Sequence, residues 1–482
     1  MAHKLPTAQP KLNFIPPAYA PWVVKLSHLF LPLMMRVRLQ PWLPAGLQTV
    51  DVLQAERAVQ QFQQLEAGQA RFLFAFRHVE VDDPLACFYL LSRAIPQAAR
   101  QAGVKLRAPV HSHFVYDRGM PLWAGAWLGW YLSKIGGIPI HRGRRLDLQA
   151  IKTVRSLLIN GELPLAIAPE GATNGHSERM STFEPGGAQL AFWCVEDLRK
   201  AGRSEAVYML PMGIQYFYPQ PNWSKLDRLL KRLEHDCGLE PLRLQRSAEP
   251  DSACYYARLL YLGEHLLIKM EQFYQRFYHR ALHPAAGNPL ESEPGNTQQP
   301  QAAGDRHQIL QVRLQVLLDQ ALKVSEEFFG IASQGQLGER CRRIEEASWQ
   351  CIYRQDLADT VNLSPLDQGL ADWSAQAASL RSLHMRLVES FTAVSSDYVH
   401  EKPSFERLAE TTLLIFDVIE RIKGKSPRRP QLGWRRVQIT IGEPLSVSDR
   451  FEAYKSSHQG AKQAIAALTE DLHTALSRTI KS

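Results

Sequence analysis

Short apolar runs alternate with amphipathic stretches along the first half of this chain, and this alternation constrains its fold more than any other feature. Residues 72–76, FLFAF, form an uninterrupted apolar run of the kind found in strands buried on both faces of a parallel sheet. The stretch 84–103 that follows has helical character, with Pro84 at its start and Gly103 at its end. Strands that alternate with helices predict an α/β domain with a central mixed, mostly parallel sheet flanked by helices.

The same alternation continues to residue 218. Pro96 is expected to kink or divide the helix at 84–103. The stretch 120–137 contains three tryptophans and is interpreted either as a buried core helix or as an aromatic wall beside an acyl chain or a bilayer. Further strands are expected at 108–115, 137–141, 163–169 and 206–218, and further helices at 147–161 and 184–202.

The sequence changes character near residue 222, where a periodicity close to that of a helix becomes dominant. We predict that the α/β domain spans 51–221 and that a strand and a helix within 430–482 complete it. Between these parts we expect a helical extension at 222–283 and an additional helical insertion at 308–425. Residues 284–307 are rich in Pro, Gly and Gln and are predicted to be a disordered linker.

Residues 1–50 are basic, because they contain five Lys or Arg residues and no Asp or Glu. Within them, 22–39 forms an apolar stretch that Lys25 and His28 interrupt, so it is not a spanning helix. It also lacks a cleavage site of the kind that ends a secretory signal. A basic, aromatic-flanked helix of this type either lies in a membrane interface or packs on the core of its own protein.

The composition limits the classes of partner. The 482 residues have a net charge of +8, a basic excess that suits phosphate groups or anionic lipid. No nucleic-acid-binding module accompanies it, so nucleic acid is not expected as a partner. The six cysteines form no C-x-x-C pair, which favours a reducing compartment over secretion. His111 and His113 have no acidic or cysteine companions nearby, so no metal site is expected.

The candidate for chemistry is the pair His78 and Asp83, at the point where the strand 72–76 gives way to a helix. Ligands of α/β sheets bind at the carboxyl ends of the strands. A carboxylate in the first helical turn can fold back to a histidine at the strand end, fix its tautomer and leave its other nitrogen free as a base. The alternative is a surface histidine followed by an ordinary helix N-cap at Asp83.

Four ordered motif blocks resemble those of the glycerolipid acyltransferase family, which includes lysophosphatidate and glycerol-3-phosphate acyltransferases. His78 to Asp83 matches the H-x4-D block, and GGIPIHR, which ends in Arg142, matches the second. APEGATNG contains the Glu170-Gly171 pair of the third block, with FEPGG downstream, and VYMLPMGI, centred on Pro211, matches the fourth. The late segment ITIGEPL is similar to the strand with which many members close the domain. The resemblance covers 70–220 well and 435–480 weakly.

The resemblance implies an O-acyltransferase of phospholipid biosynthesis. In the family, His78 would be the general base and Asp83 its partner, while Arg142, Glu170, Gly171 and Pro211 would bind substrate. The acyl group would pass directly from an acyl thioester, acyl-CoA or acyl carrier protein, to a hydroxyl of a glycerophosphate or lysolipid. No other cofactor is expected, and the chain lacks a G-x-S-x-G elbow. The enzyme would act at the cytoplasmic face of a membrane as a peripheral protein.

Two departures from the family pattern bear on the acceptor more than on the reaction. Members commonly carry Asn before the histidine and Ser two residues after it, whereas this chain has Arg77 and Glu80. After Glu-Gly they commonly continue with Thr-Arg, and here Ala172 and Thr173 follow. The favoured acceptor is 1-acyl-glycerol-3-phosphate. The alternatives are a glycerol-3-phosphate or other lysolipid acyltransferase, and a non-catalytic lipid-binding or scaffold protein.

Overall fold

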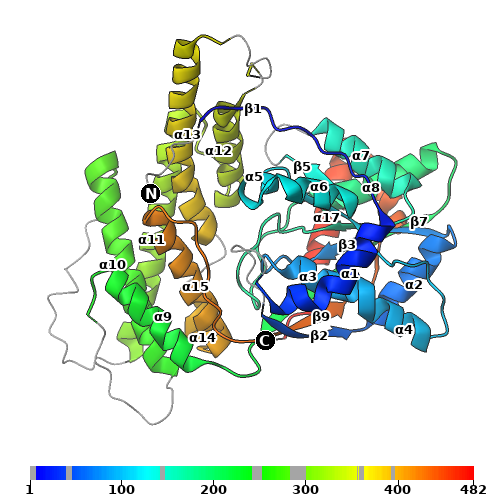
Figure 1. Cartoon of the computed structure of the whole chain (residues 1–482), viewed down its shortest axis with the longest axis horizontal. Coiled ribbons are helices and arrows are strands. Elements are labelled where there is room, and N and C mark those ends of the chain that lie inside the picture. Colours follow the sequence, from blue (N-terminus) through cyan, green and yellow to red (C-terminus); the bar gives the residue numbers. More distant parts are fainter. Residues whose placement is uncertain are drawn as a thin grey trace. The chain divides into compact units, whose positions relative to one another are not determined.

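The computed structural model describes residues 7–38, 46–141, 147–240, 252–282, 300–354, 356–357, 363–391 and 397–481. The chain forms two compact units. The α/β unit consists of Asn13–Pro221 and Arg428–Ser482, and the helical unit consists of Met1–Leu12 and Asn222–Pro427. Figure 1 shows the elements of both units with their labels.

The α/β unit is built on an eight-stranded mixed sheet. Its strands follow the order β2-β9-β7-β3-β6-β4-β5, and β10 pairs with β7 beside β9. The run β7-β3-β6-β4-β5 is parallel throughout, whereas β9 and β10 are antiparallel to β7. The predicted mostly parallel sheet is therefore confirmed. The strands are β2 (Leu47–Leu53), β3 (Ala70–Phe76), β4 (His113–Asp117), β5 (Gly137–Ile140), β6 (Leu165–Ile167), β7 (Ala206–Phe217), β9 (Arg435–Ile441) and β10 (Leu445–Ser446).

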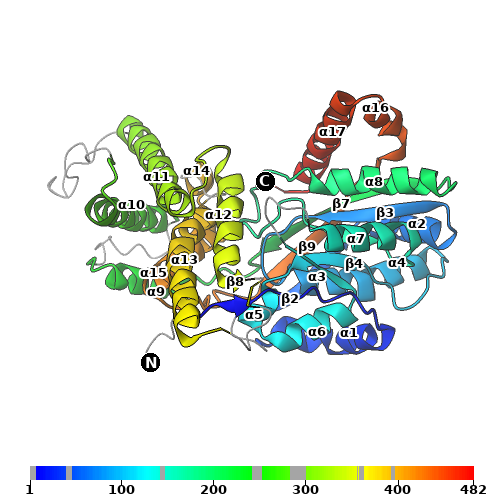
Figure 2. The same ribbon diagram turned by 90° about the horizontal axis from the view of Figure 1, so that it is seen from above.

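Helices cover both faces of this sheet, as Figure 2 shows. Central strand β3 explains why: Phe72 and Phe74 pack into one apolar core, and Leu73 and Ala75 into the other. Residues of α1 to α4 and of α6 join the first core, and residues of α7, α8, α16 and α17 join the second. The helices are α1 (Pro21–Arg36), α2 (Ala55–Glu66), α3 (Asp83–Tyr89), α4 (Ile95–Gln101), α5 (Met120–Ala124), α6 (Ala126–Lys134), α7 (Leu148–Asn160), α8 (Gly186–Lys200), α16 (Phe451–Lys455) and α17 (His458–Ser477).

Two of the expected helices are divided, one of them as predicted and the other not. The stretch 84–103 becomes α3, a π-helical turn η1 (Leu90–Ala94) and α4, with Pro96 in the first turn of α4. Proline has no N–H to donate, so a new helix begins there, as predicted. The stretch 120–137 is divided at Gly125, whose φ of +104° favours glycine.

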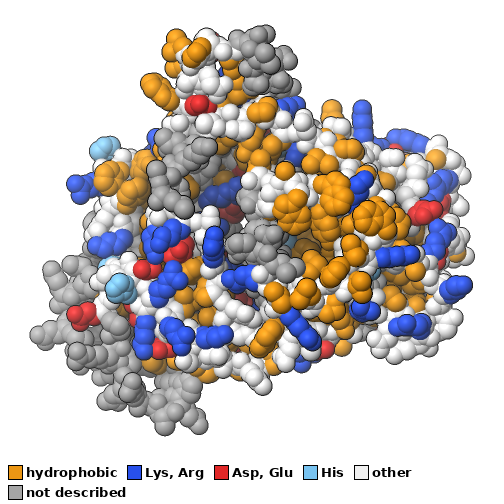
Figure 3. All heavy atoms as spheres, in the orientation of Figure 1, with side chains coloured by type: hydrophobic (Ala, Val, Ile, Leu, Met, Phe, Trp, Pro, Cys, Tyr) orange, Lys and Arg blue, Asp and Glu red, His pale blue; other side chains and the backbone are white. Residues whose placement is uncertain are grey.

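Apolar side chains of α1, α5 and α6 gather on one face of the α/β unit, where Figure 3 shows a cluster of hydrophobic spheres. The other side of α1 is buried, because Val24 and Leu31 belong to the core. Helix α1 thus packs on its own core and also presents an apolar face. Its exposed residues and those of α5 and α6 are Trp22, Leu26, Leu29, Phe30, Leu33, Leu122, Trp127 and Trp130. No helix among the described residues has the length and apolar character that a membrane span requires.

The helical unit contains α9 (Trp223–Asp236), α10 (Ser252–Tyr278), α11 (Pro300–Phe329), α12 (Leu337–Ile352), α13 (Pro365–Phe391), α14 (Asp397–Glu401) and α15 (Phe405–Ile422). Strands β1 (Gln9–Pro10) and β8 (Tyr353–Arg354) pair in parallel. Most of the predicted linker 284–307 lies outside the described residues, but α11 already begins at Pro300, inside that range.

Candidate active site

His78 and Asp83 meet at the carboxyl end of β3. Nδ1 of His78 lies 2.9 Å from Oδ2 of Asp83. An ionised carboxylate only accepts hydrogen bonds, so this contact places a proton on Nδ1 and leaves the lone pair on Nε2. The Asp83 side chain is fully buried, whereas that of His78 is 24% exposed. Among the described residues, Nε2 of His78 has no hydrogen-bond partner, so this nitrogen is available to a ligand.

The helix-cap alternative does not describe Asp83. Helix α3 begins at Asp83, its N-cap position is Asp82, and no side chain caps it. The Asp83 carboxylate instead turns back over the preceding loop, where Oδ2 also accepts the N–H of Glu80 at 3.0 Å. Its other oxygen, Oδ1, accepts the hydroxyl of Tyr216 at 2.5 Å. Tyr216 is on β7, so the carboxylate is anchored to the neighbouring strand of the sheet.

Two further carboxylates in this loop pair with arginines of the carboxyl-terminal segment. Arg435 of β9 donates to Asp82, and Nη1 of Arg429 lies 3.0 Å from both oxygens of Glu80. Burial, helped by the charges of Asp82 and Asp83, raises the pKa of Tyr216 well above its usual value, so its hydroxyl stays protonated and donating. The loop before α3 is therefore fixed by residues far away in the chain.

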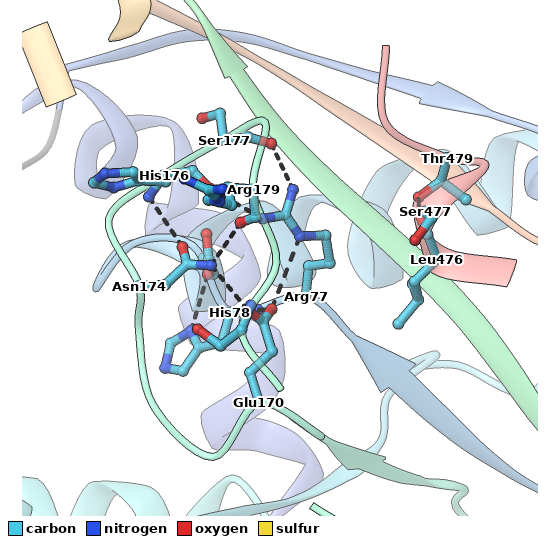
Figure 4. Close-up of polar contacts among 12 residues, drawn as sticks. Arg77, His78, Glu170, Asn174, His176, Ser177, Arg179, Leu476, Ser477 and Thr479 are labelled. Atoms are coloured by element: carbon cyan, nitrogen blue, oxygen red, sulfur yellow. Dashed lines mark hydrogen bonds and ion pairs between the residues drawn. The ribbon is translucent and has the colours of Figure 1, made fainter. Parts of the chain in front are cut away.

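Arg77 is the largest fully buried side chain beside this loop, and it organises the loop between β6 and α8, residues 168–185. Its guanidinium donates to the backbone carbonyls of His176, Ser177 and Arg179 (Figure 4). Five N–H donors in a planar fork suit such a cluster of carbonyls. The arginine that replaces the usual asparagine before the histidine thus holds the loop of the third block.

Glu170 points into the same buried cluster rather than to solvent (Figure 4). Its Oε1 accepts the N–H of His78 at 3.2 Å and lies 3.8 Å from Nε of Arg77. Its Oε2 accepts from Asn174 Nδ2 and from the N–H of Ser181, each at 2.9 Å. Burial raises the pKa of Glu170, and the charge of Arg77 opposes this rise. Both carboxylate oxygens of Glu170 accept hydrogen bonds from the protein itself. This arrangement suits the positioning of His78 and the loop better than direct contact with an acceptor.

Gly171 follows in a left-handed backbone conformation, which disfavours any other residue. Its φ is +74°, and a Cβ built on it would lie 2.0 Å from Oε1 of Glu184. The loop then crosses back to the histidine, because the N–H of Asn174 donates to His78 O at 3.3 Å and that of Gly175 to Val79 O at 2.9 Å. The loops that contain the first and third blocks are thus joined by backbone hydrogen bonds.

Comparison with known protein families gives a match within the α/β unit. Residues 104–215 match the Acyltransferase family, the glycerolipid acyltransferases. The chain contains a glycerolipid acyltransferase domain. No curated protein shows a significant match to the chain. The matched range runs from before β4 to near the end of β7, and it includes Glu170, Gly171 and Pro211 but begins after His78 and Asp83.

The acyltransferase domain places Pro211 inside β7, although proline cannot donate to a sheet ladder. Strand β10 pairs with β7 up to Met209, and β9 pairs with it from Met212 onward. Pro211 lies between these two ladders, where its carbonyl accepts the N–H of Gly442 at 2.8 Å. The N–H that Pro211 lacks would therefore lie at the point where the neighbour of β7 changes from β10 to β9. This placement gives Pro211 a role in the sheet, and substrate contact by Pro211 stays a prediction.

Arg142, predicted to bind substrate in the acyltransferase domain, lies outside the described residues, as do Arg144 and Arg145. No cluster of side chains that could hold a metal ion occurs in the described part of the chain. Sequence reasoning missed Tyr216, Arg429 and Arg435 as supports of the site. Tyr216 lies five residues after Pro211 in the fourth block, but its spacing contains no signal of a contact with Asp83.

Proposed function

We propose that this protein is an O-acyltransferase in which His78 is the general base that activates a hydroxyl of a glycerolipid precursor. The observation that carries the proposal is the 2.9 Å contact of His78 Nδ1 with the buried Asp83, which leaves Nε2 open to a ligand. General acyl transfer on glycerolipids follows from the family, and the role of this histidine is the step beyond it.

The proposed reaction is a direct transfer. Nε2 of His78 takes the proton of the acceptor hydroxyl while its oxygen forms a bond to the thioester carbonyl carbon. The carbon–sulfur bond then breaks, and the proton held on Nε2 passes to the leaving thiolate. Asp83 keeps the imidazole oriented and stabilises its positive charge between these two steps. Such general-base assistance contributes about 10²–10⁴-fold in rate.

For the acceptor we propose 1-acyl-glycerol-3-phosphate. Supporting this choice is the family block that ends in Arg142, since a guanidinium fork suits a phosphate monoester. Glycerol-3-phosphate and other lysolipids are the alternatives that an acceptor panel separates. The donor is an acyl thioester, either acyl-CoA or an acyl carrier protein.

We further propose that the protein works as a peripheral enzyme on the cytoplasmic surface of a membrane. Supporting this location is the apolar face of α1, α5 and α6, which includes Trp127 at 50% and Trp130 at 53% exposure. Indole rings suit the membrane interface because they combine an apolar body with one polar N–H. A water-insoluble acceptor would reach the enzyme from the same surface.

The decisive experiment measures transfer from a labelled acyl thioester to each acceptor of a panel by the full-length protein and by His78→Ala. We expect one acceptor to be acylated and the rate to fall about 10²–10⁴-fold in the variant. Circular dichroism of both proteins controls for folding. Undiminished turnover by a folded His78→Ala protein would transfer the role of base to another residue.

A further inference from the structure

The helical unit contains an apolar pocket of its own. It lies between α10, α11 and α15, which are side by side in Figures 1 and 2, and it is completed by residues of α13 and α14. The space, including its open mouth, measures about 1100 Å³. Most of its lining residues are apolar, and a few polar groups among apolar walls are typical of ligand pockets.

The side chains that line the pocket indicate which class of ligand it would bind. Tyr256, Glu264, Tyr274 and Thr411 are the lining residues with polar side-chain groups, and the other lining side chains are aliphatic, Met270 or Phe391. Leucine is the most frequent lining residue on α10 and α11, and α15 adds Leu414, Ile415 and Val418. Flexible aliphatic side chains suit a polymethylene chain, whereas a polar ligand would leave its hydrogen-bonding groups unpaired.

Ion pairs fix α10, one wall of the pocket, against α11 and α9. Arg313 of α11 donates from Nε and Nη2 to the two oxygens of Glu271 of α10, at 3.0 and 2.6 Å. Arg258 of α10 makes the same forked contact with Glu234 of α9, at 2.8 Å for both bonds. Two-point contacts of this kind fix orientation as well as distance. The orientation of α10 is therefore fixed by polar contacts outside the pocket.

Protein interiors are normally packed as densely as organic crystals, so apolar walls around an open space lose contacts that a ligand would supply. Gly263 of α10 shows where the space begins. This glycine lines the pocket, and a Cβ built on it would meet no atom within 4 Å. Alanine is the better helix former, so this position has room for a side chain that the helix itself would favour.

We propose that the helical unit binds one long fatty acyl chain in this pocket, separately from the acyl transfer in the α/β unit. The choice of a fatty acyl ligand rests partly on the proposed function, because an enzyme of glycerolipid acylation works among such chains. The pocket would hold the chain of a free fatty acid, an acyl thioester or a lysolipid by the same apolar contacts.

The test uses the full-length protein and a long-chain fatty acid that carries a diazirine for photolabelling, followed by peptide mapping. We expect label on α10, α11 and α15 that unlabelled palmitate removes by competition and hexanoate does not. Gly263→Phe fills the open space and should abolish the label on these helices. Gly263→Ala, which adds a single methyl group, should retain it.

A second control separates pocket filling from a general effect of a new aromatic residue. Gly369 of α13 also has no atom within 4 Å of an added Cβ, but it does not line the pocket. Gly369→Phe should therefore keep the label. Label that is absent from the three helices of the unaltered protein, or unchanged in Gly263→Phe, would overturn the proposal.

The same experiment distinguishes this proposal from the catalytic one. Labelling of the helical unit does not depend on turnover, so His78→Ala should leave it unchanged while acyl transfer is lost. A protein with no transferase activity and full labelling would refute the proposed function alone. A protein with full activity and no label on these helices would refute the pocket alone.

Discussion

Tyr216 donates its hydroxyl to Asp83 over 2.5 Å, although 133 positions separate the two residues in the chain. The same carboxylate receives the imidazole of His78 on its other oxygen. A strand on one side of β3 thus orients a side chain at the end of β3, and it does so through a hydroxyl that burial keeps protonated. This contact makes Tyr216 a positioning residue for the proposed base.

Tyr216→Phe should slow acyl transfer by about 3–10-fold, because a hydrogen bond to a charged group contributes about 1.5–3 kcal/mol and only part of it bears on the orientation of His78. The loss should appear in kcat more than in KM, since the substituted group does not touch substrate. Steady-state kinetics across pH tests this. Tyr208→Phe makes the same change on the same strand, and we expect it to have little effect. Equal losses in both variants would refute the positioning role.

Arg77→Met should lower the free energy of unfolding by about 3–5 kcal/mol, because it removes one partner of a buried ion pair and leaves Glu170 uncompensated. It also deprives the carbonyls of the 168–185 loop of their donor. Chemical denaturation measures the change. Arg199→Met removes an exposed ion pair with Glu452 and should cost less than about 1 kcal/mol. A loss of that size for Arg77→Met would contradict the organising role.

The contribution of buried histidines to stability should fall as the pH drops from 6.5 towards 4. Burial lowers the pKa of both His28 and His111 to about 4, so in this window the unfolded chain binds more protons than the folded one. The ring of His28, on α1, lies 6.2 Å from that of His111 between their centroids. His111→Gln should flatten the pH dependence by about 2–3 kcal/mol over this window.

Denaturation curves at several pH values test this prediction. The slope should shrink but persist, since burial also lowers the pKa of His176 to about 4. Below pH 4 the contribution of these histidines should level off, because both states are then protonated. An unaltered slope in His111→Gln would show that this ring is not the group that titrates.

The apolar face of α1, α5 and α6 should control membrane binding. Leu29→Glu with Trp130→Glu places two charges on residues that are 68% and 53% exposed, and should weaken sedimentation with anionic liposomes. These surface changes test the face more cleanly than removal of residues 1–45, because Val24 and Leu31 of α1 are buried in the core. Leu148→Glu on α7, where Leu148 is 63% exposed, should leave binding unchanged and is the matched control.

The sequence predicted those parts of the fold that depend on local pattern. The run 72–76 became the central strand β3, and the proline at 96 divided its helix, because both effects act within a few residues. Strand β2, the first strand of the large sheet in chain order, was not predicted. Its core contacts come from Leu47 and Val50, and its partner β9 lies almost four hundred residues further along the chain, so its place depends on long-range pairing.

The candidate site was predictable to the same degree. The five-residue step from His78 to Asp83 is a local relationship, and their contact is present in the structure. The residues that hold this loop in place were not predictable, because Tyr216, Arg429 and Arg435 belong to segments far away in the chain. Arg77 and Glu80 looked like departures from a family pattern. The structure gives each a partner of opposite charge, Glu170 for Arg77 and Arg429 for Glu80, and the sequence contains no signal of these pairs.

The position of β9 between β2 and β7 has a consequence for synthesis of the protein. During synthesis β2 and β7 emerge early. The strand that lies between them, β9 (Arg435–Ile441), emerges only after the whole of Asn222–Pro427. Until then, β2 and one edge of β7 offer unpaired N–H and C=O groups to any strand they meet. Nascent chains halted inside the helical unit should therefore aggregate or recruit chaperones. The final fifty-five residues contain the strand that joins β2 to the rest of the sheet.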